Sequence, residues 1–172
     1  MSGFNDWLED MNARDTKVRA VLRRSLAFDP GAHIPAFPYV EPFLKGEAEG
    51  WRRQMHYLVA GLWAAHWRDD RTGIPMSLAK ACALHQIKSG SANTERRFIH
   101  LLDADHEQLP HRLRQKVALL KEQPIEFQAL LHDLLSWNLD NRRIQIAWAR
   151  DFYRTLNPSA TPETELETET EE

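Results

Sequence analysis

Apolar residues recur at helical spacing along most of the chain. Between about residues 47 and 67, Trp51, Met55, Leu58 and Leu62 stand three or four positions apart, which places them on one side of an α-helix. Similar spacing predicts further helices over about residues 4–12, 15–26, 76–88, 93–102, 110–120 and 124–137, and from 140 onward. Alternating apolar and polar runs, which a half-buried strand requires, are absent at any convincing length. The pattern predicts an all-α protein, a compact helical bundle of about eight or nine helices.

Capping and breaking residues set the expected helix ends. Asp15 and Asp140 suit the residue before a helix, and Gly90 suits a left-handed stop. Pro110 and Pro124 suit the first turn of a helix, where the missing N–H is not needed. Four prolines between residues 28 and 43 forbid a long helix but allow short turns. The apolar residues of that stretch predict a buried connection.

The length of the chain limits the number of domains. Its 172 residues, 42% of them hydrophobic, suffice for one ordinary domain or two small helical lobes. We expect a single helical domain over residues 1–157, with a polar loop near 69–75 offering a division into lobes 1–75 and 76–157. Residues 158–172 repeat Thr-Glu and contain one large apolar residue, Leu166. Such a segment buries too little to offset its ordering entropy, so we predict a disordered acidic tail.

The net charge of −3 hides an uneven distribution. All 22 Lys and Arg lie at or before Arg154, whereas six of the 25 Asp and Glu lie in the last ten residues. Residues 1–157 therefore carry 22 basic against 19 acidic side chains, a net charge of +3. A basic domain with an acidic tail favours binding of a polyanion.

Arginines and lysines gather on the predicted helix faces. On the last helix Arg143, Arg150 and Arg154 fall within roughly 40° of one another at 100° per residue. Other basic groups are Arg23-Arg24, Arg52-Arg53, Arg96-Arg97, and Arg112, Arg114 and Lys116. The guanidinium fork meets two phosphate oxygens at once, so these faces predict contact with nucleic-acid backbone without sequence readout. The alternative is that each group is a solvated face or pairs with carboxylates inside the molecule.

Signatures of catalysis and of metal binding are weak. The glycine-rich nucleotide loops, GxSxG and HExxH are all missing. The His132-Asp133 dipeptide, with His100 and Asp103, leaves a metal-dependent phosphohydrolase as a low-ranking alternative. The six tryptophans can stack on bases, although at helical spacing they more often belong to the core. We expect no cofactor and no metal.

The sequence also bears on the cellular compartment. Cys82 is the single cysteine, so the chain cannot form an internal disulfide, as fits a reducing compartment. The N-terminal residues are charged and lack the apolar core of a signal peptide. The longest apolar run, Leu58 to Ala65, is too short to cross a bilayer. We expect a cytoplasmic protein.

An ordered set of segments resembles a known family. The segments are AVLRRSLA (20–27), IPAFPYVEPF (34–43), TGIPMSLAKACA (72–83), NTERRFIHLLDAD (93–105), LPHRLRQKVALL (109–120), LLSW (134–137) and NRRIQIAWARDFY (141–153). Over about residues 7–156 the chain resembles the CasB family, the small subunit of the type I-E CRISPR surveillance complex Cascade. No single segment is highly specific, but their order and spacing are.

The resemblance implies a non-catalytic, all-helical subunit of an antiviral defence complex. It implies partners: other Cascade subunits, guide RNA, target DNA and the displaced strand, and a second copy in a head-to-tail pair. Carried over by position, the phosphate-contact residues would be Arg23, Arg24, Arg52, Arg53, Arg96, Arg97, Arg114, Lys116, Arg142 and Arg143. The turn at 103–107 is acidic where family members tend to be basic, so it would contribute less. A rival hypothesis is an assembly module that contacts only partner proteins.

Overall fold

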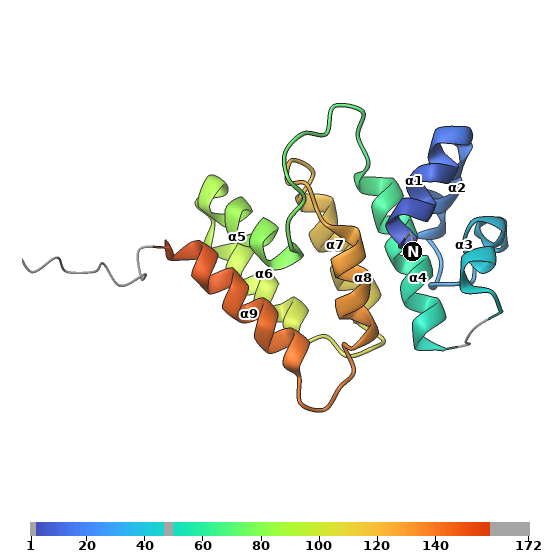
Figure 1. Ribbon diagram of the computed structural model, residues 1–172. Helices are drawn as coiled ribbons and strands as arrows, with labels where there is room; N and C mark the ends of the chain where they lie inside the picture. Colours follow the sequence, from blue (N-terminus) through green and yellow to red (C-terminus); the bar gives the residue numbers. More distant parts are fainter. Residues whose placement is uncertain (1–2, 47–49, 159–172) are drawn as a thin grey trace, which may run out of the picture.

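Helices dominate the computed structural model, which describes residues 3–46 and 50–158 (Figure 1). In chain order they are α1 (Phe4–Arg14), α2 (Lys17–Ser25), the short 3₁₀ helix η1 (Ile34–Ala36), α3 (Phe37–Leu44), α4 (Trp51–His66), α5 (Leu78–Ser89), α6 (Ala92–Leu102), α7 (Leu109–Leu119), α8 (Phe127–Leu135) and α9 (Arg143–Leu156). The all-α prediction is confirmed. The predicted helix start at Glu47 and the predicted disorder of residues 159–172 fall outside the described residues.

Helix α4 is the centre of the N-terminal part, with α1, α2 and α3 on one side of it and α7 and α8 on the other (Figure 1). All ten residues from Met55 to Ala64 are buried. Gly61 lets α2 come close, because a Cβ there would lie 2.6 Å from Cδ2 of Leu26 and 3.2 Å from the Leu22 carbonyl oxygen. A larger residue at this position would push the two helices apart.

The C-terminal part is built from α5, α6 and α9, with α7 and α8 between it and α4 (Figure 1). Phe98 of α6 stacks on Phe152 of α9 with ring centroids 4.4 Å apart. The loops before α5 and α8 are joined by two hydrogen bonds, from the Met76 N–H to the Pro124 carbonyl and from the Glu126 N–H to the Met76 carbonyl, each 2.8 Å. The division into two lobes near residue 75 stays a prediction.

Several helix ends differ from the sequence predictions. The proline-rich stretch forms an eight-residue helix, α3, with Pro38 in its first turn and Pro42 inside it, where short turns were expected. Helix α8 starts at Phe127, not at Pro124, because the Glu126 side chain accepts hydrogen bonds from two N–H groups of its first turn. The last helix starts at Arg143, after Arg142 in a left-handed conformation (φ 53°), and Asp140 does not cap it. Gly90 ends α5 at φ 66°, as predicted.

Within the described ranges, none of the helices combines the length and the apolar character needed to cross a membrane.

Candidate nucleic-acid interface

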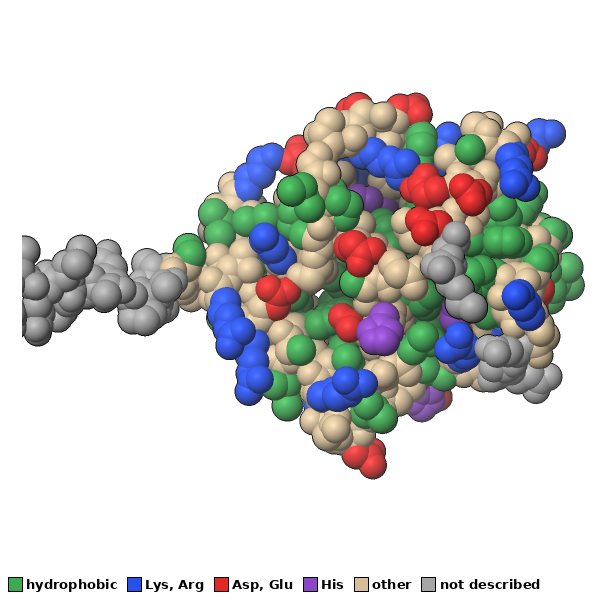
Figure 2. Space-filling model, viewed as in Figure 1, with side chains coloured by type: hydrophobic (Ala, Val, Ile, Leu, Met, Phe, Trp, Pro, Cys, Tyr) green, Lys and Arg blue, Asp and Glu red, His purple; other side chains and the backbone are tan. Residues whose placement is uncertain are grey.

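The outer face of α9 carries a row of arginines. Its inner face is fixed by Ile144, Trp148 and Phe152, all buried, so Arg143, Arg150 and Arg154 are turned outward and exposed. Figure 2 shows blue side chains along the edge of the molecule that α9 forms. The Arg143 guanidinium donates to the Ser136 hydroxyl at 3.2 Å. Among the residues that the structure describes, Arg150 and Arg154 have no ion-pair partner, which leaves their donors available for phosphate oxygens.

Helix α6 adds two more exposed arginines beside α9. Arg96 and Arg97 follow Glu95, whose carboxylate accepts a 2.8 Å hydrogen bond from the Tyr153 hydroxyl of α9. That hydrogen bond raises the pKa of Tyr153 above its ordinary value, so the phenol stays protonated and keeps the two helices together. Arg96 and Arg97 have no carboxylate partner in the described part of the chain.

Arg23 and Arg24 lie in the last turn of α2, and both are exposed. The helix dipole favours cations at this end, so these two arginines do not destabilise α2. Neither has an ion-pair partner within the described ranges. They lie on the N-terminal part of the molecule, so the basic residues of α2 and those of α9 are in separate regions (Figure 1).

Arg114 and Arg142 are exposed but tethered. The Arg114 guanidinium donates to the Leu26 carbonyl, which joins α7 to the end of α2. The Arg142 guanidinium donates to the Leu102 carbonyl at 2.8 Å and lies 3.8 Å from the Asp103 carboxylate. Each arginine therefore holds a loop while part of its fork remains in solvent.

The doublet on α4 is divided between solvent and the interior. Arg52 is exposed, whereas Arg53 packs against the loop after α2. The Arg53 guanidinium donates to the Glu41 carboxylate at 2.8 Å and to the Gly31 carbonyl at 3.2 Å. It also lies over the Phe37 and Tyr57 rings, 4.9 and 4.7 Å from their centroids. Four internal contacts make Arg53 a structural residue.

Lys116 departs most from the sequence prediction. Its side chain is only 4% exposed, and its ammonium donates to the Thr94 carbonyl at 3.3 Å. Burial lowers the pKa of Lys116, because water no longer solvates the charge. Positions 114 and 116 are about 200° apart on a helix, so Arg114 and Lys116 cannot share one outer face. We therefore remove Lys116 from the set of phosphate contacts.

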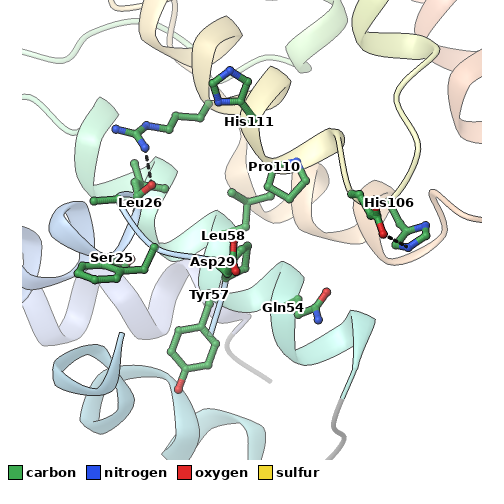
Figure 3. Close-up of a pocket in the computed structure, with 14 residues that line it drawn as sticks. Ser25, Leu26, Asp29, Gln54, Tyr57, Leu58, His106, Pro110 and His111 are labelled. Atoms are coloured by element: carbon green, nitrogen blue, oxygen red, sulfur yellow. Dashed lines mark hydrogen bonds and ion pairs between the residues drawn. The ribbon is translucent and has the colours of Figure 1, made fainter. Parts of the chain in front are cut away.

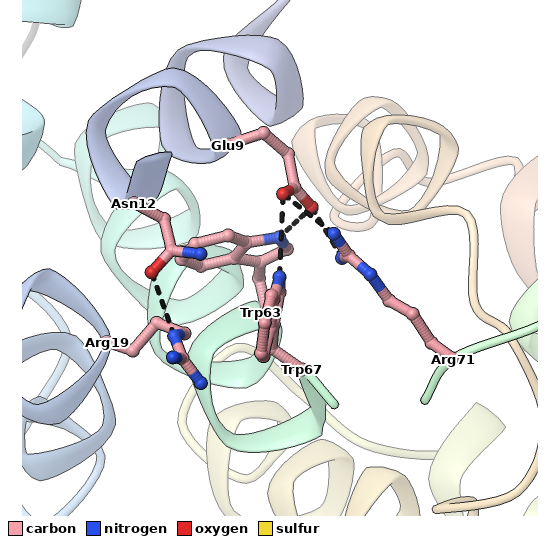
Figure 4. Close-up of polar contacts among 6 residues, drawn as sticks. All are labelled: Glu9, Asn12, Arg19, Trp63, Trp67 and Arg71. Atoms are coloured by element: carbon pink, nitrogen blue, oxygen red, sulfur yellow. Dashed lines mark hydrogen bonds and ion pairs between the residues drawn. The ribbon is translucent and has the colours of Figure 1, made fainter. Parts of the chain in front are cut away.

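A polar cluster joins α1 to the end of α4 (Figure 4). The Glu9 carboxylate accepts hydrogen bonds from the Trp63 indole at 3.1 Å and from Arg71 at 2.6 and 2.9 Å. Burial alone would raise the pKa of Glu9, but hydrogen bonds from Arg71 and Trp63 and the Arg71 charge hold the pKa below its ordinary value. Arg19 lies 3.8 Å above the Trp67 ring and binds Asn12. Arg19 and Arg71 therefore stabilise the fold. The Trp63 and Trp67 indoles both donate hydrogen bonds to Glu9.

The two carboxylates of the phosphohydrolase hypothesis have other partners in the structure. The Asp133 carboxylate accepts a 2.8 Å hydrogen bond from the Trp148 indole, and Asp103 lies beside Arg142. No group of three His, Cys, Asp or Glu suited to a metal ion occurs among the described residues. Burial raises the pKa of the Cys82 thiol to about 12, so this side chain is an inert core residue.

The structure thus separates the predicted residues into groups. Arg23, Arg24, Arg52, Arg96, Arg97 and Arg143 are exposed, Arg114 and Arg142 are exposed and tethered, and Arg53 and Lys116 face inward. Arg150 and Arg154 are not among the ten residues that the resemblance implies. Helical periodicity alone had placed them on the outer face of α9.

Comparison with known proteins tests the resemblance. Residues 18–153 match the family described as CRISPR-associated protein Cse2. A Cse2 protein from Thermus thermophilus is 48% identical over 153 residues, which cover 87% of this chain and 88% of the relative. The crystal structure of CasB from Thermus thermophilus has a TM-score of 0.78 at 46% identity, covering 87% of this chain and 95% of that one.

The fold also occurs inside a larger assembly. A chain of a CRISPR RNA-guided surveillance complex matches with a TM-score of 0.75 at 22% identity, covering 91% of this chain and 96% of that one. At this identity the match concerns the fold. The family match over most of the chain and the relative at 48% identity are decisive. The chain belongs to the Cse2 family of CRISPR-associated proteins, whose members include CasB, as the order of its motifs predicted.

Proposed function

We propose that the chain is the non-catalytic small subunit of a CRISPR RNA-guided surveillance complex in the cytoplasm and that it holds nucleic-acid backbone for that complex. Its bound strands would be the guide RNA–target DNA region and the displaced DNA strand. Membership of the Cse2 family supports the first part of the proposal, together with the occurrence of the same fold in such a complex. Other subunits of the complex and a second copy of this chain would be its protein partners.

The row of arginines on α9 carries the second part. Three guanidinium groups share one outer face, and Arg150 and Arg154 have no carboxylate within the described ranges to neutralise them. Unpaired arginines on one face repel each other and stabilise nothing inside the molecule. A polyanion lying along α9 would remove that repulsion and release counterions from its phosphates.

This mode of binding assigns sequence specificity to other parts of the complex. Guanidinium groups that contact phosphate carry no sequence information, so recognition would come from base pairing with the guide RNA. The subunit would stabilise the opened DNA equally well at any target sequence. Its role would be to shift the balance between the opened and closed duplex, which is close to even without protein contacts.

A salt titration tests the proposal. Binding of fluorescent single-stranded and duplex DNA would be measured for the full chain and for Arg150→Ala/Arg154→Ala. We expect the slope of log affinity against log salt on single strands to fall by about 1.4, at about 0.7 per lost phosphate contact. The matched control is Arg14→Ala/Lys17→Ala, which removes two exposed charges where α1 meets α2, far from α9.

The outcomes separate two functions. Salt-sensitive binding that weakens in the α9 variant and not in the control supports strand holding. Absence of binding at about 20 mM salt, together with normal incorporation into the reconstituted complex, contradicts it and favours the assembly module. An equal loss in both variants would show that only total charge matters and that α9 has no special role.

A further inference from the structure

A groove of about 540 Å³ lies between the loop after α2, helix α4 and the start of α7 (Figure 3). The α2 side contributes Leu26, Phe28 and Asp29, and α4 contributes Tyr57. Its other wall is formed by His106, Glu107, Pro110, His111 and Arg114. Both apolar and polar side chains line the groove, as a flat molecule with polar edges requires.

Phe28 has an unusual environment for an aromatic residue. Its ring lines the groove and stacks on the His33 ring, with centroids 4.6 Å apart and the planes 16° from parallel. Nevertheless half of its surface (50%) is exposed to solvent. Two parallel rings at the surface form a flat platform, and base–aromatic stacking is the common means of holding an unpaired nucleobase.

The loop that carries the platform is held rigidly. The Arg53 guanidinium donates to the Gly31 carbonyl at 3.2 Å, and Arg114 donates to the Leu26 carbonyl. Backbone hydrogen bonds from the Phe28 N–H to the Ser25 carbonyl (3.1 Å) and from the Ala32 N–H to the Asp29 carbonyl (2.9 Å) close two turns within it. A loop fixed in this way loses little entropy when it binds a ligand.

The charges around the groove separate a base from its phosphates. Asp29 and Glu107 line the groove, and two carboxylates there repel phosphate but accept hydrogen bonds from the amino groups of bases. Arg23 and Arg24 immediately precede the loop, are exposed, and have no ion-pair partner in the described part of the chain. A nucleotide would therefore place its base in the groove and its backbone beside the end of α2.

We propose that Phe28, backed by His33, is a stacking platform for an unpaired nucleobase that enters this groove from a single strand. The proposal rests on the proposed function and adds a second kind of contact to it, directed at bases and located on the N-terminal part of the molecule. It gives a function to the half-exposed Phe28 ring, which follows closely after Arg23 and Arg24 in the chain.

The test compares two strands with the same phosphates. Anisotropy would be measured for the full chain with a fluorescent 20-nucleotide single strand of mixed sequence and with the same strand carrying consecutive abasic sites. We expect wild type to bind the abasic strand about tenfold more weakly, a typical loss for one stacked base. Phe28→Ala should bind the complete strand about tenfold more weakly and should no longer distinguish the two strands.

The controls keep the test specific. Phe28→Trp retains a flat ring and should restore discrimination between the strands. Ile34→Ala removes an apolar side chain that is 71% exposed near the same loop and should change nothing. The salt slope should stay constant in Phe28→Ala, because no phosphate contact is lost.

Two results overturn the platform. If binding is salt-sensitive and Phe28→Ala discriminates between the strands as wild type does, strand holding stands and the platform does not exist. If Phe28→Ala instead binds DNA normally but fails to join the reconstituted complex, the exposed ring contacts a partner protein. Failure of every strand to bind at about 20 mM salt would contradict the proposed function and the platform together.

Discussion

The arginines around α4 and those on α9 have opposite surroundings. Arg53 touches a carboxylate, a carbonyl and two aromatic rings, whereas Arg150 and Arg154 face solvent with no ion-pair partner among the described residues. Both sets look alike in the sequence, as basic residues on helices. The difference teaches that the role of a surface charge is decided by which residues other elements bring beside it.

The contrast between the two sets of arginines can be tested most directly at Arg53. Arg53→Ala should lower the free energy of unfolding by about 2–3 kcal/mol, because it removes charged hydrogen bonds and ring contacts together. Chemical denaturation measures this, with Arg150→Ala as the control that should leave stability unchanged within about 0.5 kcal/mol. A stable Arg53→Ala that binds DNA poorly would instead place Arg53 in the interface.

The cluster around Glu9 gives a second test of the contrast between structural and exposed arginines. Glu9→Gln should destabilise the protein by about 1–2 kcal/mol at neutral pH, because the hydrogen bonds from Arg71 and Trp63 lose their charged acceptor. The lowered pKa of Glu9 means that its contribution is fully present above its ordinary pKa of 4.5 and is lost as pH falls through the folded-state pKa. Thermal melts of both proteins from pH 7 to pH 3 should therefore converge; a constant gap would contradict this.

At Lys116 we expect a substitution to increase the stability of the protein. Lys116→Met should stabilise the protein by about 1 kcal/mol at pH 7, because a buried ammonium without a carboxylate partner within the described ranges is replaced by an apolar chain of similar length. Since the folded-state pKa lies below the ordinary 10.5, wild-type stability should rise between those two values, and the variant's should not. DNA affinity should not change; a marked loss would return Lys116 to the interface.

Arg142 gives the smallest expected effect. Its left-handed backbone (φ 53°) is strained for arginine and alanine and relaxed for glycine, while its side chain holds the Leu102 carbonyl. Arg142→Gly should be more stable than Arg142→Ala by about 0.5–1 kcal/mol, since both lose the side-chain contact and only alanine keeps the strain. Melting of the two variants side by side measures it, and equal stabilities would mean that the turn relaxes.

Helical periodicity predicted the helices that bury one face against the core. The stripe Ile144, Trp148 and Phe152 identified the buried face of α9, and Gly90 ended α5. Helical periodicity underestimated the length of α3. A helix with Pro42 inside is unfavourable in isolation and depends on buried Val40 and Leu44. The periodicity also missed the start of α9, which follows a left-handed turn whose arginine binds the end of α6.

By itself the sequence determined the all-helical class, the family, and the apolar stripe of each regular helix, because helical periodicity and motif order are local properties of the chain. Only the tertiary structure decided which cations are available. A helix puts Lys116 on one side of its own axis, but the packing of α6 against α7 makes that side the interior. Likewise, the surface pairing of Phe28 with His33 required a folded loop held by arginines from two other helices.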